Sequence, residues 1–289
     1  MTKPGHHSRW QVVRGYLLLP HAVPVAVVML ATAAFALVAT DGCPGASPMI
    51  RLLGAMLGAQ LAIGAVNDLV DAELDAIAKP AKPIPSGLVS HRGALTVAIT
   101  GLVLMTDLSL TFGAGSFLLC ALGGSAGLAY SLWFKPTIWS WIPYLVALPL
   151  LPIWVWTALS EVDPGLFAIY PIGAAAVIAV QIAQSLPDIE ADRQTGVRTL
   201  AVALGPVNAR RLCWGAMILA AISAAVLAPW LTEHAVRAWL SAAVAVALVA
   251  LNAVIWSRDQ RSGELACFPC TALAATALGI GWTTALTGP

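Results

Sequence analysis

Long apolar stretches alternate with short polar segments along the whole chain. The stretches fall at roughly residues 16–40, 50–69, 91–110, 114–134, 138–158, 165–187, 210–230, 237–256 and 266–287. A helix needs about 20 apolar residues to cross the hydrocarbon core of a bilayer. The pattern therefore predicts an all-α, polytopic membrane protein whose nine transmembrane helices form a single bundle.

The composition supports a membrane protein. Of the 289 residues, 59% are hydrophobic and only 10% are charged, whereas soluble domains carry about 25% charged residues. The mean hydropathy is +0.84. The net charge of +1 gives no indication of a nucleic-acid partner, and we expect none.

Lysine and arginine are distributed unevenly between the two predicted sides of the membrane. One side, formed by the N-terminal segment and the loops after the second, fourth, sixth and eighth apolar stretches, holds thirteen of them: Lys3, Arg9, Arg14, Lys79, Lys82, Arg92, Lys135, Arg193, Arg198, Arg210, Arg211, Arg258 and Arg261. The other side holds Arg51 and Arg237. Because cytoplasmic loops are enriched in these residues, we expect a cytoplasmic N-terminus and an external C-terminus.

Acidic side chains follow the second apolar stretch in a helical pattern. Asn67, Asp71 and Asp75 are spaced i, i+4, i+8, and Asp68 lies beside them. On a helix this spacing stacks the side chains on one face, with neighbours about 5–6 Å apart. Gathered carboxylates repel one another and lose solvation, and a bound divalent cation is the natural compensation.

The same spacing recurs at the end of the sixth apolar stretch, in Gln184, Asp188 and Asp192. Two such arrays favour a binding site over two solvated helix ends, and both lie on the predicted cytoplasmic side. Each is followed by a cationic loop, residues 79–87 and 193–205. The recurrence suggests two weakly related halves, about 1–135 and 136–289, within one transmembrane domain that spans residues 1–289.

Carboxylates at the end of an apolar bundle, with cations nearby, suit a metal-bound diphosphate that bears a hydrocarbon chain. Mg²⁺ would remove the repulsion between diphosphate and carboxylates and neutralise charge as the diphosphate leaves. Lys82 and Arg198 are the favoured contacts to the remaining phosphate oxygens. The apolar bundle would bury the chain.

These motifs carry a resemblance to a known family. Asn67-Asp68-x-x-Asp71-x-x-x-Asp75, the Lys79-Pro-x-Lys82-Pro-x-Pro-Ser-Gly87 segment, and Asp188-x-x-x-Asp192 with Gly196 and Thr199 resemble the UbiA superfamily of intramembrane prenyltransferases. The resemblance covers nearly the whole chain. It implies a prenyl diphosphate donor, a hydrophobic or aromatic acceptor in the membrane lipid, and Mg²⁺ as cofactor. It also implies metal binding by Asn67, Asp68, Asp71, Asp75, Asp188 and Asp192, with Asp71, Asp75, Asp188 and Asp192 as the catalytic set.

The chain departs from the family pattern at two positions. Lys82 stands where the family often has Arg, and a lysine lacks the bidentate fork of a guanidinium. The family often places a Lys four residues after a Tyr, whereas Tyr130 and Lys135 are five apart. The resemblance implies that Tyr130 and Lys135 contact the diphosphate, and Arg14 is a further candidate.

Two other classes of protein remain alternatives to a prenyltransferase. A membrane terpene cyclase could use the same fold and ionise the same substrate, and a transporter could use the carboxylates to bind ions. A cyclase needs a pocket rich in aromatic faces. The tryptophans gather around residues 133–156, and small residues dominate stretches such as 220–226 and 242–248, so we expect transfer. The sequence assigns no general base, and we interpret His21 as a packing residue.

Overall fold

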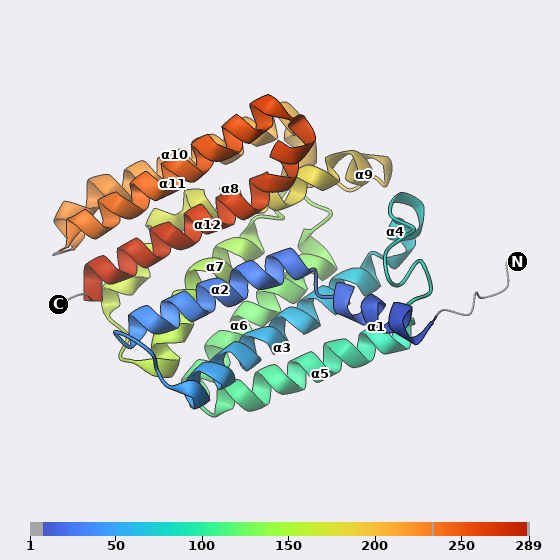
Figure 1. Ribbon diagram of the computed structural model, residues 1–289, viewed down its shortest axis with the longest axis horizontal. Helices are drawn as coiled ribbons and strands as arrows, with labels where there is room; N and C mark the ends of the chain where they lie inside the picture. The colour runs from blue at the N-terminus through green and yellow to red at the C-terminus, as the bar shows by residue number, and fades with distance from the viewer. Residues whose placement is uncertain (1–7, 233, 288–289) are drawn as a thin grey trace, which may run out of the picture.

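The computed structural model describes residues 8–232 and 234–287, which form a bundle of helices (Figure 1). Lys3 and Pro289, used in the charge and topology predictions, lie outside the described residues. Within the described residues, nine spans are long and apolar enough to cross a membrane. They are α2 (Ala22–Ala39), α3 (Ala46–Val70), α5 (His91–Leu110), α6 (Ala114–Ala129) with η1 (Tyr130–Phe134), α7 (Ile142–Leu159), η2 (Pro164–Ala168) with α8 (Ile169–Ser185), η3 (Leu186–Asp188) and α9 (Ile189–Gln194), α10 (Leu200–Leu231), α11 (Ala235–Arg258) and α12 (Gln260–Thr287). The prediction of an all-α, nine-span membrane protein is confirmed.

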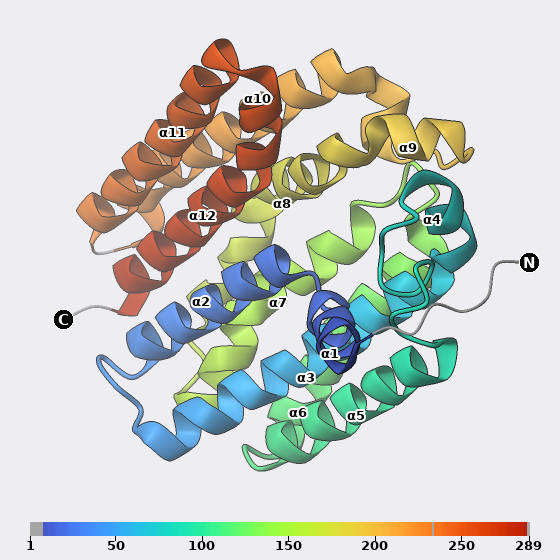
Figure 2. The ribbon, with the colours of Figure 1, turned by 45° about the vertical axis from the view of Figure 1, so that its right-hand side comes forward.

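The helices form a closed ring with others packed outside it. Around the ring, α2 packs against α3, α3 against α6, α6 against α7, α7 against α8, α8 against α12, and α12 again against α2. Outside the ring, α5 covers α3 and α11 covers α12 (Figures 1 and 2). This arrangement leaves the inner faces of the ring helices directed at a common interior.

Two glycines allow α3 and α5 to cross at very short range. A Cβ atom on Gly58 would lie 2.6 Å from the carbonyl oxygen of Gly101, and one on Gly101 would lie 2.5 Å from the carbonyl oxygen of Gly58. Small residues are typical of such close crossings in membranes, where packing holds helices together. The crossing fixes the position of α3, which carries Asn67 and Asp68 and leads directly into Asp71 and Asp75.

The predicted first helix, 16–40, is wrong at its start. The structure has α1 (Arg9–Leu18) and a separate α2 that begins at Ala22. Pro20 has no backbone N–H to donate, and His21 adopts the left-handed conformation with φ of 56°. The chain therefore turns between the two helices, and α1 packs over the loop before α5, with Gly15 against Leu88.

The predicted start of the seventh helix, residue 210, is also wrong. In the structure α10 begins at Leu200, and a kink at Gly205 interrupts it before Pro206. Gly205 has φ of 73°, which a residue without Cβ adopts at low cost. The segment that the sequence suggested to be a loop is therefore partly helical.

Short helices continue both acid-bearing spans. The helix α3 ends at Val70 and α4 (Ala72–Ala78) follows at once, while α8 is continued by η3 and α9. The N–H of Asp71 donates to the Asn67 carbonyl at 3.0 Å and that of Asp75 to the Asp71 carbonyl at 2.7 Å, so helical bonding persists through the first array. Figures 1 and 2 place α4 and α9 at the same end of the bundle.

Candidate functional site

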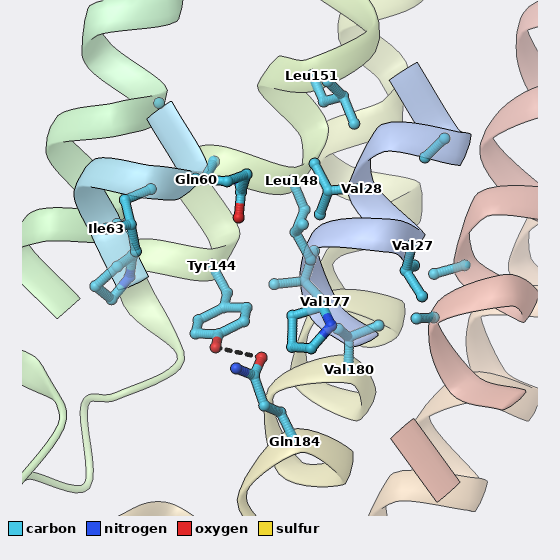
Figure 3. A pocket seen from close by; sticks show the side chains of 18 of the residues that line it. Val27, Val28, Gln60, Ile63, Tyr144, Leu148, Leu151, Val177, Val180 and Gln184 are labelled. Carbon is cyan, nitrogen blue, oxygen red and sulfur yellow. Dashed lines mark hydrogen bonds between the residues drawn. The ribbon is translucent and has the colours of Figure 1, made fainter. Parts of the chain in front are cut away.

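A cavity of about 770 Å³ lies inside the helix ring. Over most of its length it is apolar, and Figure 3 shows Val27 and Val28 of α2, Leu148 of α7 and Val180 of α8 directed into it. At the end toward α4 and α9 the lining becomes polar and charged, with Asn67, Lys79, Lys82, Tyr130, Lys135, Gln184, Asp188 and Asp192. The cavity thus joins a hydrocarbon-like interior to a charged end.

The carboxylates of the first array are buried. Asp68 is 2% exposed, and Asp71 and Asp75 are each 7% exposed. The ammonium of Lys82 donates to Asp68 Oδ1 at 2.9 Å and to Asp75 Oδ2 at 2.7 Å. Burial opposes protonation of Lys82, but these two carboxylates outweigh it and raise the pKa of the ammonium above its ordinary value. One lysine therefore compensates two carboxylates.

The proline-rich loop after α4 brings Lys82 back onto the array. Its prolines prevent a continuous helix, and turn-type hydrogen bonds replace helical ones, such as Lys82 N–H to the Lys79 carbonyl at 3.0 Å. Farther along, the Val89 N–H donates to the Pro83 carbonyl at 3.0 Å. Ile84 and Val89 are buried in a small apolar cluster with Leu19, Ala72 and Ala94. The fold of the loop thus positions the ammonium.

A π-helical turn positions Lys135. Its N–H donates to the Tyr130 carbonyl, five residues back, at 2.8 Å. The Lys135 ammonium forms an ion pair with Asp71, which also accepts a hydrogen bond from Asn67 Nδ2 at 3.2 Å. A π-helical hydrogen bond spans five residues, whereas an α-helical one spans four. The five-residue spacing that departs from the family pattern therefore still places a lysine at the carboxylates.

The second array meets the first across the charged end of the cavity. The Lys79 ammonium, at the end of α4, forms an ion pair with Asp188 of η3, 109 residues later. A smaller cavity of about 110 Å³ is lined by carboxylates from both arrays, Asp71, Asp75, Asp188 and Asp192, and by Lys79 and Lys135. The structure therefore brings together the two arrays that the sequence showed separately.

Two tyrosines lie where the charged end meets the apolar interior. Tyr144 OH donates to Gln184 Oε1 at 2.6 Å (Figure 3). The Tyr130 and Tyr144 rings meet edge to face, with centroids 5.2 Å apart. The sequence alone does not single out Tyr144, because it lies in a helix with no other polar side chain near it.

Arg14 and Arg198 lie apart from this cluster. Both are exposed, and neither lines the two cavities described above. The backbone N–H of Arg198 donates to the Pro136 carbonyl at 3.2 Å, which ties the loop after α9 to the chain after η1. Their contact with a phosphate stays a prediction.

His21 contacts the first array, although the sequence suggested only a packing role. Its Nε2 lies 3.2 Å from Asp68 Oδ1, and it lines the main cavity. The signal in the sequence was the break at Pro20, which turns the chain and brings His21 to the end of the cavity. The length of the apolar run concealed that break.

The aromatic lining of the main cavity comes from several helices. Trp154 of α7, whose Nε1 donates to Ser116 Oγ at 3.0 Å, lines it together with Phe35 of α2 and with Phe268 and Trp282 of α12. Trp133 and Trp139 are instead 67% and 53% exposed. The gathering of tryptophans around residues 133–156, which favoured transfer over cyclisation, therefore does not describe the aromatic lining of this cavity.

The donor set suits a hard cation. Within residues 8–232 and 234–287, no three carboxylate, imidazole or thiol groups converge on one point. Asp68 and Asp75 nevertheless direct oxygens at one shared cation, the Lys82 ammonium. Carboxylate oxygens are the ligands that Mg²⁺ prefers, so these side chains fit a divalent cation at positions where lysines now lie.

The fold and the site define a helical membrane protein whose apolar interior ends at two facing groups of carboxylates and lysines. The chain belongs to the UbiA prenyltransferase family, whose model matches residues 27–268. The helices from α3 to α11 fall wholly in this range, together with most of α2 and the start of α12.

Named relatives cover part of the chain. The bacteriochlorophyll synthase 33 kDa chain of Cereibacter sphaeroides is 35% identical over 193 residues, 62% of this chain and 63% of that protein. The digeranylgeranylglyceryl phosphate synthase of Natronomonas pharaonis is 29% identical over 219 residues, 73% of this chain and 77% of that protein. The first of these matches thus spans less than two thirds of the relative.

Solved structures share the fold over nearly the whole chain. A UbiA homolog from Archaeoglobus fulgidus, bound to GPP and Mg²⁺, matches with a TM-score of 0.68 at 20% identity, covering 94% of this chain and 98% of that one. The apo structure of a UbiA homolog from Aeropyrum pernix K1 matches with a TM-score of 0.64 at 19% identity, covering 88% of this chain and 95% of that one. At this identity the likeness establishes the fold.

Proposed function

We propose that this protein transfers an isoprenyl group from a prenyl diphosphate to a hydrophobic or aromatic acceptor within the membrane, with Mg²⁺ as cofactor. The observation that supports this function best is the meeting of two carboxylate arrays and three lysines at the charged end of a 770 Å³ apolar cavity. Such a site suits an anionic diphosphate with a hydrocarbon chain. The Archaeoglobus relative bound to GPP and Mg²⁺ supports the same ligands.

The two arrays would hold the metal. In this proposal Asn67, Asp68, Asp71 and Asp75 bind on one side and Asp188 and Asp192 on the other. Bound Mg²⁺ supplies neutralisation of the charge that develops on the diphosphate. Asp71, Asp75, Asp188 and Asp192 line the small cavity directly, whereas Asp68 lies behind Lys82.

The other side chains would hold the donor for cleavage of its C–O bond. Lys82 and Lys135 bind diphosphate oxygens, and Tyr130 lies beside them in the lining of the cavity. The bonding electrons leave with the diphosphate, the acceptor attacks C1 of the allylic cation, and the acceptor then loses a proton. The apolar interior excludes water that would otherwise capture the cation. Relatives named for the synthesis of bacteriochlorophyll and of digeranylgeranylglyceryl phosphate support a hydrophobic acceptor.

We also propose that residues 1–289 act as one domain built from two related halves, about 1–135 and 136–289. The parallel endings of α3 and α8 support this division, because each acid-bearing span is continued by a short helix, α4 or α9. The two halves meet through Lys79 and Asp188.

The orientation in the membrane is a further part of the proposal. The excess of lysine and arginine on one side predicts that the charged end of the cavity faces the cytoplasm, with the N-terminus on the same side and the C-terminus outside. Reporter fusions after Gly87 and after Gly196 should therefore report a cytoplasmic position, and a fusion at Pro289 an external one. An external signal from both loop fusions would contradict the orientation.

Product analysis tests the reaction itself. Purified protein should be incubated with Mg²⁺, a series of prenyl diphosphates and a membrane-lipid extract, and the products identified by mass spectrometry. We expect a prenylated acceptor and free pyrophosphate, with turnover lost in EDTA and restored by Mg²⁺.

Omitting the lipid extract separates transfer from cyclisation. A transferase given only donor and Mg²⁺ should yield little beyond slow hydrolysis to the open-chain alcohol. A cyclic hydrocarbon or alcohol as the main product would replace the transferase proposal with a cyclase, and the aromatic side chains from α2, α7 and α12 would then surround the cation.

A further inference from the structure

Lysine ammonium groups occupy the places where a metal would meet the carboxylates. Lys82 bridges Asp68 and Asp75, Lys135 pairs with Asp71, and Lys79 pairs with Asp188. The Lys82 and Lys135 side chains are only 19% and 20% exposed, so these pairs are shielded from water. In the described part of the chain, these ion pairs involve Asp68, Asp71 and Asp75 on one side of the site and Asp188 on the other.

We propose that Lys79, Lys82 and Lys135 are internal counter-ions that keep divalent metal out until a diphosphate arrives. When it arrives, the ammonium groups move onto its oxygens and release the carboxylates to the metal. The inference rests on the proposed function, because it assumes that both ligands use this site. It adds Lys79 to the side chains that control the site.

Charge explains the exclusion. A metal at the Lys82 position would share Asp68 and Asp75 with an ammonium less than 3 Å from each, and the two cations would repel. Displacing the ammonium without a new partner leaves a partly buried charge uncompensated, which is strongly unfavourable. Metal alone therefore competes poorly with the lysines.

A diphosphate removes this barrier. Its oxygens offer the ammonium groups charge-assisted hydrogen bonds in place of those they lose, and the flexible four-carbon stem of lysine allows the shift. Lys79, Lys82 and Lys135 line the main cavity, so they can reach a ligand there while their stems stay in place. Metal and diphosphate then raise each other's affinity, as linkage requires.

Lys79 has a distinct part because it joins the two arrays. It lines both cavities, and its partner Asp188 belongs to the second array, whereas Lys82 and Lys135 pair with the first. Removing Lys79 should free only the second array for metal, and removing Lys82 only the first. The two variants therefore test the exchange at separate places.

Equilibrium dialysis of Mn²⁺ against the purified full-length protein measures metal binding without turnover. We expect weak binding of Mn²⁺ alone and binding at least about tenfold tighter when inorganic pyrophosphate is present on both sides. Lys82→Met and Lys79→Met, which keep the stem and remove the charge, should each bind Mn²⁺ alone about tenfold more tightly than the wild type. Lys82→Arg, which keeps a positive charge, should bind Mn²⁺ alone as weakly as the wild type does.

Arg92→Met is the matched control, because Arg92 is an exposed cation in the first half of the chain that lines neither cavity. It should leave Mn²⁺ binding unchanged. Thermal unfolding without Mn²⁺ shows whether each variant is folded. With Mn²⁺ present, the melting temperature of Lys82→Met should rise more than that of the wild type.

The outcomes distinguish failure of the counter-ion role from failure of the proposed transferase function. The counter-ion role is overturned if Mn²⁺ affinity is the same with and without pyrophosphate. It is also overturned if neither Lys82→Met nor Lys79→Met binds Mn²⁺ alone more tightly than the wild type. Either result leaves the transferase proposal standing. Absence of Mn²⁺ binding under every condition overturns both.

Discussion

Replacing Asp71 or Asp188 with Asn should reduce prenyl transfer by a factor of about 10² or more, because each change removes a charge from a carboxylate that we propose as a metal ligand, and such a ligand is worth several kcal/mol in the transition state. Asn keeps the size of the side chain and one carbonyl acceptor. The expected loss is therefore one of charge and not of packing. Initial rates of product formation at saturating Mg²⁺ measure it.

The geometry of the site is the reason to expect that loss of one carboxylate from either array disables it. Asp71 directly follows α3 and Asp188 ends η3, and both line the smaller cavity together with Asp192 and two lysines. In the proposed site, each side contributes carboxylates that hold the metal-bound diphosphate between them. Since Asp71→Asn leaves the Lys135 ammonium without its carboxylate partner, thermal unfolding should be measured in parallel.

Glu73→Gln and Glu190→Gln are the matched controls. Glu73 and Glu190 are exposed carboxylates beside the two arrays, and neither lines the cavities described above. Both variants should keep rates close to that of the wild type. Full activity in Asp71→Asn or Asp188→Asn, or an equal loss in the glutamate variants, would refute the assigned roles.

Gly58→Ala should sharply reduce the amount of folded protein. The added Cβ would lie 2.6 Å from both the Gly101 carbonyl oxygen and the Met105 backbone nitrogen, and backbone atoms inside a helix cannot move aside singly. Overpacking of this kind costs about 1–3 kcal/mol or more. The variant should also lose activity, because separation of α3 from α5 displaces Asn67 and Asp71. Yield after size-exclusion chromatography and the melting temperature report the effect.

Gly215→Ala is the matched control for this substitution. Gly215 lies in α10, and a Cβ atom added there would meet no atom of a neighbouring segment within 4 Å, so alanine finds no obstacle. Removing a glycine from a helix should stabilise it by up to about 1 kcal/mol. A Gly58 variant as stable as the Gly215 variant would mean that the crossing tolerates wider spacing.

Much of the architecture was predictable because lipid limits what a chain can do. A spanning segment must satisfy its own backbone hydrogen bonds, so each long apolar run has to become a helix. The acidic arrays were visible for a similar reason. Asn67, Asp71 and Asp75 repeat at the helical period, and the helical hydrogen bonds across Asp71 preserve that period where α3 gives way to α4.

The partners of the carboxylates were not predictable. Periodicity places side chains on a face of their own helix, but Lys82 reaches Asp68 through a proline-rich loop and Lys79 reaches Asp188 across the bundle. His21 itself adopts the left-handed backbone conformation directly after Pro20, and this turn sets the position of its side chain. The surrounding apolar run concealed the turn in the sequence. Each of these contacts is set by tertiary packing.

The π-helical turn at residues 130–134 accommodates one residue more between hydrogen-bonded groups than a regular α-helical turn does. In a regular α-helix, an extra residue rotates everything after it by about 100° and would turn Lys135 away from Asp71. Here the wider turn absorbs the residue locally, and the N–H of Lys135 still closes onto Tyr130. An alignment with a shorter relative should therefore place its gap inside this turn. Residue spacing alone suggests that Lys135 is displaced by one position relative to the family pattern, although its ammonium still reaches Asp71.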